Sequence, residues 1–181
     1  MPDSTRALVI VDIQNDYFPG GRCELAGPEQ AAERAARVLA GFRERNEPVF
    51  HIRHVWEGDD AAFFEPGTPG VEINEAVRPA DGEPVVQKAY PNSFRETDLE
   101  QRLRAAGASD VVVVGMMTSM CVDATVRAAA DLGFGCTVVH DACACPDLEF
   151  DGRVIPAASV HGAFIAALGD GYAHVTAADD V

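Results

Sequence analysis

Short apolar runs rich in valine and isoleucine recur along the 181-residue chain, separated by longer stretches whose apolar residues recur every three or four positions. Near-continuous apolar runs of this length are typical of strands buried on both faces of a parallel sheet. The runs predict six strands, at residues 7–12, 48–54, 84–88, 110–115, 136–141 and 173–176. The longer amphipathic stretches predict four helices, at residues 28–45, 96–107, 119–133 and 156–171.

The alternation of strands and helices predicts an α/β protein. We expect a three-layer α-β-α, Rossmann-like fold, whose six-stranded parallel sheet has the order 3-2-1-4-5-6 and carries helices on both faces. No break in composition divides the chain, so residues 1–181 are expected to form a single domain. The long segment 55–83 contains several prolines and glycines, and loops of this length are often functional.

Composition narrows the possible partners and surroundings. The formal net charge of −15 repels phosphate backbones, so nucleic acid is not expected to bind. The five-residue apolar run near the N-terminus is too short for a signal peptide, and no segment approaches the roughly 20 apolar residues of a membrane span. We therefore expect a cytoplasmic protein without a membrane partner. Its five irregularly spaced cysteines are expected to be free thiols.

Three ionisable residues lie at the ends of predicted strands. Asp12 closes the first strand and Lys88 the third, while Cys121 follows the fourth, just inside the next helix. Ligands of open α/β sheets bind beyond the carboxyl ends of the strands, so these side chains are expected to converge. A helix N-terminus lowers the pKa of a thiol and offers N–H groups to an oxyanion. Taken singly, each residue also has a structural explanation, such as a small core cysteine.

The chain resembles the isochorismatase-like cysteine hydrolases over nearly its full length. Three segments carry the resemblance: "VIVDIQNDYFPGG" (9–21), "QKAYPNSFRETDL" (87–99) and "VVVVGMMTSMCVDATVRAAADLGF" (111–134). The resemblance implies a catalytic triad of Asp12, Lys88 and Cys121. It also implies a cis peptide bond between Met116 and Met117, and an oxyanion hole formed by the backbone N–H groups of Met117 and Cys121.

The implied reaction is acyl transfer through a thioester. Asp12 takes the thiol proton of Cys121, Lys88 stabilises the charged pair, and water later releases the acyl group. We expect a hydrolase of a small amide, carbamoyl or ureido C–N bond that uses neither metal nor cofactor. Two alternatives stay open. The first is a catalytically idle member of the family that binds a metabolite or joins an assembly. The second is a hydrolase of a non-amide acyl substrate.

Departures from subgroups of the family narrow this expectation. True isochorismatases lack the nucleophilic cysteine, so the presence of Cys121 argues against isochorismate as the substrate. Nicotinamidases carry an Asp-x-His metal motif after the second strand, where this chain has His54 and Trp56. His51 and His54 are three positions apart on a strand and point to opposite faces, which makes them poor joint ligands. No metal site is therefore expected.

Other residues are expected to shape the pocket. Phe18, Trp56 and Tyr90 lie just beyond strand ends and are expected to wall the site, with ordinary loop packing as the alternative. Ser119 stands where many relatives have a histidine, so it is also expected near the substrate. The resemblance further implies a homodimer or homotetramer that binds a small-molecule substrate. The "ACACP" stretch at 142–146 lacks a second cysteine pair and is expected to be structural.

Overall fold

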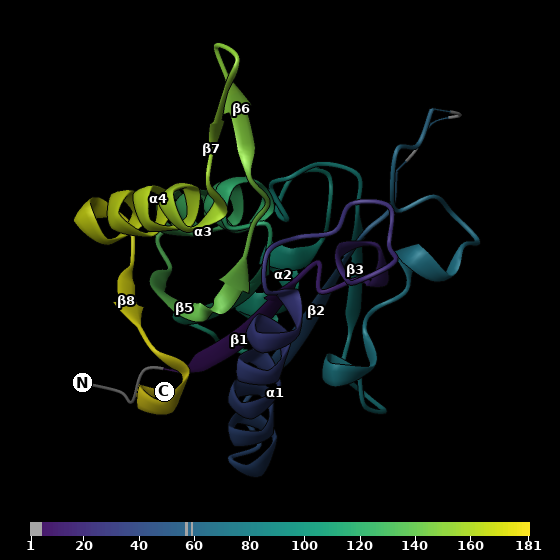
Figure 1. The fold of residues 1–181 in the computed structure, drawn as a ribbon. Coiled ribbons are helices and arrows are strands. Elements are labelled where there is room, and N and C mark those ends of the chain that lie inside the picture. The colour runs from purple at the N-terminus through teal and green to yellow at the C-terminus, as the bar shows by residue number, and fades with distance from the viewer. Residues whose placement is uncertain (1–4, 57, 59) are drawn as a thin grey trace.

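A six-stranded, fully parallel sheet forms the centre of the protein (Figure 1). The computed structural model describes residues 5–56, 58 and 60–181. The strands of the sheet are β1 (Arg6–Val11), β2 (Val49–His54), β3 (Val85–Lys88), β4 (Asp110–Met116), β5 (Gly135–Ala144) and β8 (His174–Thr176). Their order is β3-β2-β1-β4-β5-β8, which confirms the predicted order of the six parallel strands.

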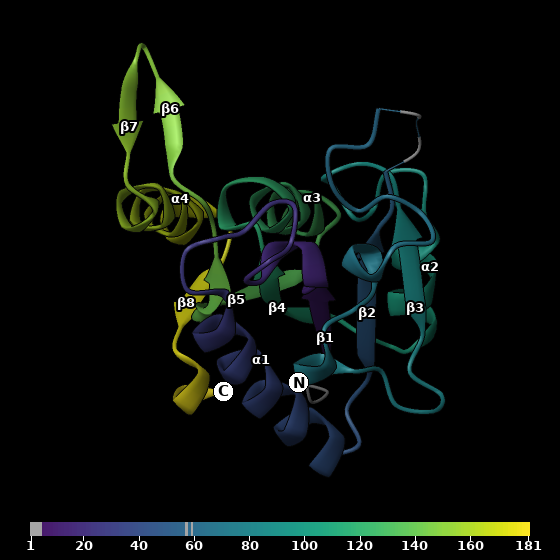
Figure 2. The same cartoon turned by 45° about the vertical axis from the view of Figure 1, so that its right-hand side comes forward.

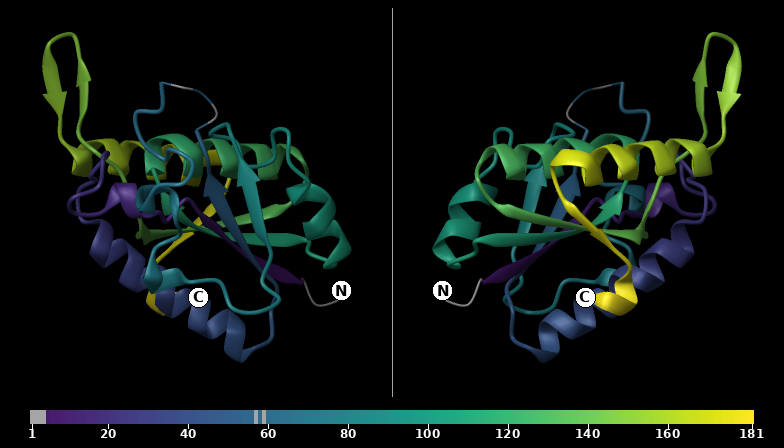
Figure 3. Two further views of the ribbon diagram at one scale, coloured as in Figure 1. Left: turned by 90° about the vertical axis from the view of Figure 1, so that its right-hand side faces the viewer. Right: turned by 90° about the vertical axis from the view of Figure 1, so that its left-hand side faces the viewer.

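Helices cover both faces of the sheet, so the predicted three layers are confirmed (Figure 3). The helix α1 (Pro28–Glu44) packs on one face; α2 (Leu99–Ala105), α3 (Asp123–Asp131) and α4 (Ala157–Gly171) pack on the other. Side chains alternate along β1, because Leu8 and Ile10 pack with the α1 cluster whereas Val9 and Val11 pack with the opposite cluster. Figure 2 shows α1 and α3 on opposite sides of the strands.

Local sequence explains why α1 begins and packs where it does. Gly27 adopts φ 66° just before the helix, and Pro28 supplies the fixed φ that suits the first helical turn. Ala35, Leu39 and Phe42 recur at helical spacing and are buried against the sheet.

Two helices begin later than predicted, for reasons of local backbone conformation. Glu96 has φ 57°, which no α-helix accommodates, and α2 therefore starts at Leu99. After β4, the Val122 N–H donates to the Met117 carbonyl five residues earlier, which forms a π turn before α3. Such π turns are frequent at functional sites.

The sequence prediction omitted a two-stranded hairpin formed by β6 (Leu148–Phe150) and β7 (Arg153–Ile155). Asp151 and Gly152 join its strands with φ 51° and 68°, as in the tight turns that Asp-Gly favours. The hairpin projects beyond α4, away from the sheet (Figures 1 and 2). Phe150 is 75% exposed and Val154 65% exposed.

These exposed side chains offer a test of the expected homo-oligomer, which stays a prediction. Apolar side chains this exposed favour burial against another surface. If the hairpin is buried between two copies, Phe150→Asp will lower the mass measured by light scattering to that of a monomer. Glu149→Asp on the same strand serves as the control and should leave the mass unchanged. A wild-type monomer at micromolar concentration would contradict the expectation.

None of the helices in the described part of the chain has both the length and the apolar character needed to cross a membrane.

Candidate active site

The structure brings the three predicted residues together at the carboxyl edge of the sheet. Asp12 follows β1 directly, with φ 48°, a conformation that residues other than glycine rarely adopt and that is enriched at functional sites. Lys88 ends β3, and Cys121 lies in the π turn after β4. Lys88 Nζ lies 2.7 Å from Asp12 Oδ2, and neither side chain is exposed to solvent. Their catalytic roles stay predictions.

Lys88 is the only lysine in the chain; the other 13 basic residues are arginines. Its ammonium group has three hydrogens and three partners within reach. It lies 2.7 Å from Asp12 Oδ2, 3.0 Å from the Tyr90 carbonyl and 3.3 Å from His54 Nδ1. Burial alone lowers the pKa of Lys88, but the negative charge of Asp12, with a smaller contribution from Cys121, outweighs burial and raises it. Lys88 is therefore a permanent cation within the core.

The Cys121 thiol differs from the expectation drawn from the helix N-terminus. Burial raises the pKa of Cys121 far above its usual range; the carboxylate of Asp12 raises it further and Lys88 opposes both. A lowered thiol pKa, as the sequence suggested, is therefore wrong for this site. The reason is that Cys121 is buried and that the α-helix begins only at Asp123, after the π turn. The resting thiol is protonated and needs a base.

Asp12 is placed to serve as that base. One ligand atom each from Asp12, His54 and Cys121 lies within 4.8 Å of the other two. Both carboxylate oxygens of Asp12 are buried, and among the described residues neither has a hydrogen-bond partner, although Oδ2 forms the ion pair with Lys88. Oδ1 is therefore available to accept a proton.

His54 is the site residue that the sequence analysis missed. Its Nδ1 lies 3.9 Å from Cys121 Sγ and 3.3 Å from Lys88 Nζ. The buried side chain of Gln14 holds it in place, because Gln14 Oε1 accepts from the His54 N–H and Gln14 Nε2 donates to the His54 carbonyl, both at 2.8 Å. Burial, reinforced by Lys88, lowers the pKa of His54, so its imidazole is neutral at pH 7.

The two histidines of β2 do not share a ligand site. His51 Nε2 instead lies 2.8 Å from Glu83, whereas His54 faces Cys121. Asp12, His54 and Cys121 offer the donor atoms of a metal site, but the Lys88 ammonium already occupies the space beside Asp12 and His54. A fixed cation within hydrogen-bond distance of two donors opposes a metal ion there. The absence of a catalytic metal stays a prediction.

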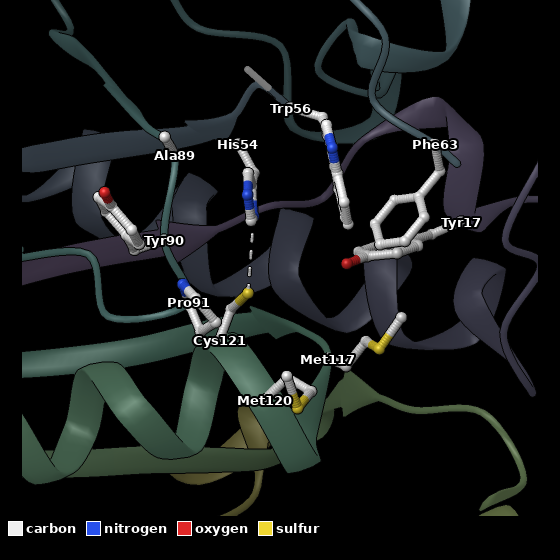
Figure 4. A pocket seen from close by; sticks show the side chains of 10 residues that line it. All are labelled: Tyr17, His54, Trp56, Phe63, Ala89, Tyr90, Pro91, Met117, Met120 and Cys121. Atoms are coloured by element: carbon white, nitrogen blue, oxygen red, sulfur yellow. Dashed lines mark hydrogen bonds between the residues drawn. The ribbon is translucent and has the colours of Figure 1, made fainter. Parts of the chain in front are cut away.

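A cavity of about 490 Å³ opens above the thiol (Figure 4). Its lining residues are Tyr17, His54, Trp56, Phe63, Ala89, Tyr90, Pro91, Met117, Met120 and Cys121. Trp56 and Tyr90 thus face the cavity, although their contact with substrate is still a prediction. The cavity is not lined by Phe18, which packs against the apolar core, or by Ser119, whose hydroxyl is buried. Both residues thus lie outside the wall of this cavity, and their contact with substrate stays a prediction.

The turn between β4 and the thiol depends on a glycine. Gly115 has φ 135° at a register shift between β4 and β5, and a Cβ there would overlap the Val11 backbone. The chain then passes through a cis peptide bond between Met116 and Met117, the bond that the resemblance implies. Met117 lines the cavity beside Cys121. The oxyanion role of their N–H groups stays a prediction.

Asp16 fixes the aromatic wall of the cavity. Its buried carboxylate accepts from the Phe64 N–H at 2.6 Å and from the Arg22 N–H at 3.2 Å, which ties together two loops far apart in sequence. Tyr17, which follows Asp16, and Phe63, which precedes Phe64, both contribute rings to the cavity wall. The centroids of the two rings lie 5.9 Å apart. The long segment after β2 is therefore anchored to the loop that follows β1.

Gly70→Ala should disturb this wall, because a Cβ at Gly70 would overlap the Asp16 carboxylate. We expect a loss of about 1–3 kcal/mol of stability and a KM raised about tenfold for cavity-binding substrates. Thermal unfolding and steady-state kinetics measure the two effects. Gly162→Ala in α4, where an added Cβ meets open space, is the matched control. Equal behaviour of the two variants would show that Asp16 does not position the wall.

Comparisons with known proteins agree with this architecture. The sequence profile of the isochorismatase domain matches residues 6–179. The isochorismatase family protein YddQ of Bacillus subtilis strain 168 is 52% identical over 171 residues, which cover 94% of this chain and 95% of YddQ. The structure of an isochorismatase hydrolase from Oleispira antarctica superposes with a TM-score of 0.95 at 49% identity, over 99% of this chain and 97% of the other.

A solved relative with a named activity has the same fold. N-carbamoylsarcosine amidase from Thermoplasma acidophilum superposes with a TM-score of 0.82 at 28% identity, over 98% of each chain. The profile match spans nearly the whole sequence, and the relatives match over nearly their full lengths. The chain therefore belongs to the isochorismatase family of hydrolases.

Proposed function

We propose that this hydrolase cleaves the C–N bond of a small amide, carbamoyl or ureido compound, with Cys121 as the nucleophile. The observation that carries the proposal is a buried thiol that faces an open cavity and lies beside the Asp12–Lys88 ion pair. A core cysteine with a structural role alone would not require two buried opposite charges beside it, because burying them is costly.

The first chemical step transfers a proton inside the site. The thiol of Cys121 is protonated at rest, so Asp12 accepts its proton as the thiolate forms. Lys88 keeps its positive charge and stabilises the thiolate in place of the lost carboxylate charge. The net charge of the three groups is unchanged, which keeps the cost of the step low in a buried site.

The thiolate then attacks the carbonyl carbon, and the carbonyl oxygen becomes an oxyanion. The proposed donors to that oxyanion are the backbone N–H groups of Met117 and Cys121. As the C–N bond breaks, the protonated Asp12 returns its proton to the leaving amine. Water, activated by Asp12, attacks the resulting thioester; the acid product leaves and the thiol re-forms.

The relatives support an amide as the substrate. N-carbamoylsarcosine amidase, by its name, acts on a carbamoyl C–N bond, and it shares this fold over nearly its whole length. A streptothricin hydrolase of Streptomyces noursei is 35% identical over 170 residues. Neither name identifies the substrate of the present chain.

Ammonia release from a panel of primary amides, carbamoyl amines and ureido acids tests the proposal. The protein should be dialysed against a chelator and its metal content measured. Release by metal-free protein would support metal-independent amide hydrolysis. Release that requires added metal would contradict the proposed mechanism. If the protein hydrolyses thioesters or oxygen esters but none of the amides, the proposed substrate class changes from an amide to another acyl compound.

His54→Phe should lower kcat about 10- to 100-fold, because one Lys88 hydrogen then lacks an acceptor in a buried site. In His54→Gln the side-chain carbonyl can accept that hydrogen, so part of the rate should return. Equal rates in both variants would argue against a role in holding Lys88.

The pH profile separates this role from mere packing. The pKa of His54 is lowered, so its neutral form is lost only as the pH falls below the usual histidine range. Protonated His54 cannot accept from Lys88 and repels it. The kcat of the wild type should therefore fall as the pH drops below the usual histidine range. The kcat of His54→Gln should not show this fall at low pH.

A further inference from the structure

None of the described residues that line the cavity is an arginine, lysine, aspartate or glutamate, and outside the reacting centre its polar side-chain atoms are the hydroxyls of Tyr17 and Tyr90 and the Trp56 indole N–H. Seven of its ten residues are aromatic, proline or methionine: Tyr17, Trp56, Phe63, Tyr90, Pro91, Met117 and Met120. The other three are Ala89 and the two site residues His54 and Cys121. A substrate whose carbonyl reaches the thiol must therefore place the rest of its acyl group against a largely apolar surface.

The aromatic rings come from two sides of the cavity. Trp56, Phe63 and Tyr17 form one side, whereas Tyr90 lies across from them beyond His54 (Figure 4). The rings of Trp56 and Phe63 meet at 64° with centroids 5.5 Å apart, an edge-to-face contact that holds both in place. On the opposite side, the Arg95 guanidinium lies 3.6 Å from the Tyr90 ring centroid. Fixed rings on both sides suit a flat, apolar group.

The cavity offers no cation to an anionic substrate. No arginine or lysine is among the described residues that line it. Lys88 lies beneath the site, and its charge is matched by Asp12 at 2.7 Å. A carboxylate on the substrate would lose its hydration without gaining a cation as its partner, which is costly. The net charge of −15 also repels anions before they reach the cavity.

We propose that the site takes amides whose acyl group is uncharged, flat and apolar, and that it rejects counterparts bearing a carboxylate. This inference rests on the proposed amide hydrolysis and specifies its substrate class. It sets this chain apart from the relative named for N-carbamoylsarcosine, since sarcosine carries a carboxylate. The cavity volume of about 490 Å³ lies in the range of sites for small molecules.

Three matched amides test the proposal: benzamide, 4-carbamoylbenzoate and 4-(aminomethyl)benzamide, which are neutral, anionic and cationic at pH 7. We expect kcat/KM for benzamide to exceed that for the benzoate by at least about 100-fold. The cationic amide should fall between the two. An anionic amide hydrolysed as well as benzamide, or a cationic one hydrolysed faster, would overturn the substrate class.

Met120 allows a gain-of-function test. It lines the cavity and is 50% exposed, so an arginine there can reach both water and a bound carboxylate. Met120→Arg should narrow the ratio between benzamide and 4-carbamoylbenzoate about tenfold, more than the uncharged variant Met120→Gln. Equal ratios in both variants would show that charge in the cavity does not set the preference.

The outcomes separate this inference from the proposed function. Hydrolysis of other amides, carbamoyl amines or ureido acids, with none of the three benzamides cleaved, would overturn the substrate class alone. Failure to hydrolyse any amide would overturn the proposed function and the inference together.

Discussion

Cys121→Ala should lower amide hydrolysis by at least about 10⁴-fold, because no other group in the site can form the thioester. Its sulfur faces the cavity and lies 3.9 Å from the neutral His54. The loss of one buried sulfur atom is expected to cost only about 1 kcal/mol of stability, since alanine fits the same small volume. Steady-state kinetics should therefore show a large loss of activity in this variant, whereas thermal unfolding should show only a small loss of stability.

Two further variants make this test specific. Cys121→Ser keeps the size of the side chain, but its hydroxyl is a far weaker nucleophile, so it should fail almost as completely. Cys143→Ala removes another buried cysteine, from β5, and should retain the wild-type rate. More than a few per cent of activity in Cys121→Ala would refute covalent catalysis at this residue.

Selective alkylation at neutral pH is a common test for a reactive cysteine, and the raised pKa of Cys121 limits its use here. Burial raises the pKa of Cys136 to about 11 and of Cys143 to about 12, and it raises the pKa of Cys121 as well. Preferential alkylation of Cys121 at neutral pH is thus not expected from acidity alone. A more direct observation is an acyl adduct on Cys121 by mass spectrometry after rapid acid quench.

The fold was predictable because its central strands have unambiguous patterns. Valine-rich runs such as 110–115 leave no polar face, so they fit only a sheet covered on both sides. The hairpin at 148–155 was missed because its strands are only three residues long and bury no side chain. Its Asp151-Gly152 turn was nevertheless a usable signal for two short antiparallel strands.

The site was predictable where it depends on strand ends, and less so where it depends on loops. Because β2 lies between β1 and β3, its last residue must lie near Asp12 and Lys88. The predicted strand order was therefore a usable signal for His54, and the observed register pairs it with Lys88 directly. Phe63 could not be placed, because long-range contacts such as the Phe64 N–H donating to Asp16 determine where its loop returns, and no sequence pattern indicates them.

The pKa of the nucleophile illustrates a different limit. Position in the sequence indicated a helix N-terminus beside Cys121, which lowers a thiol pKa. Desolvation acts in the opposite direction and dominates, because Cys121 is buried in the packed structure. Sequence patterns predict which residues meet, whereas the balance of charge and burial requires the packed structure.

Lys88→Met should lower kcat by about 10²–10³-fold or more, and it should also destabilise the fold by about 3–5 kcal/mol. The Asp12 carboxylate would then be buried without a cation, since its nearest positive charge lies 2.7 Å away in the wild type. Lys88 is the only lysine in the chain, so no other ammonium group can replace it.

The double variant Asp12→Asn/Lys88→Met tests this explanation. It removes both buried charges, so it should recover most of the stability lost in Lys88→Met while remaining inactive. Chemical denaturation measures the first effect and ammonia release the second. Recovery of activity along with stability would exclude direct participation of the ion pair in the reaction.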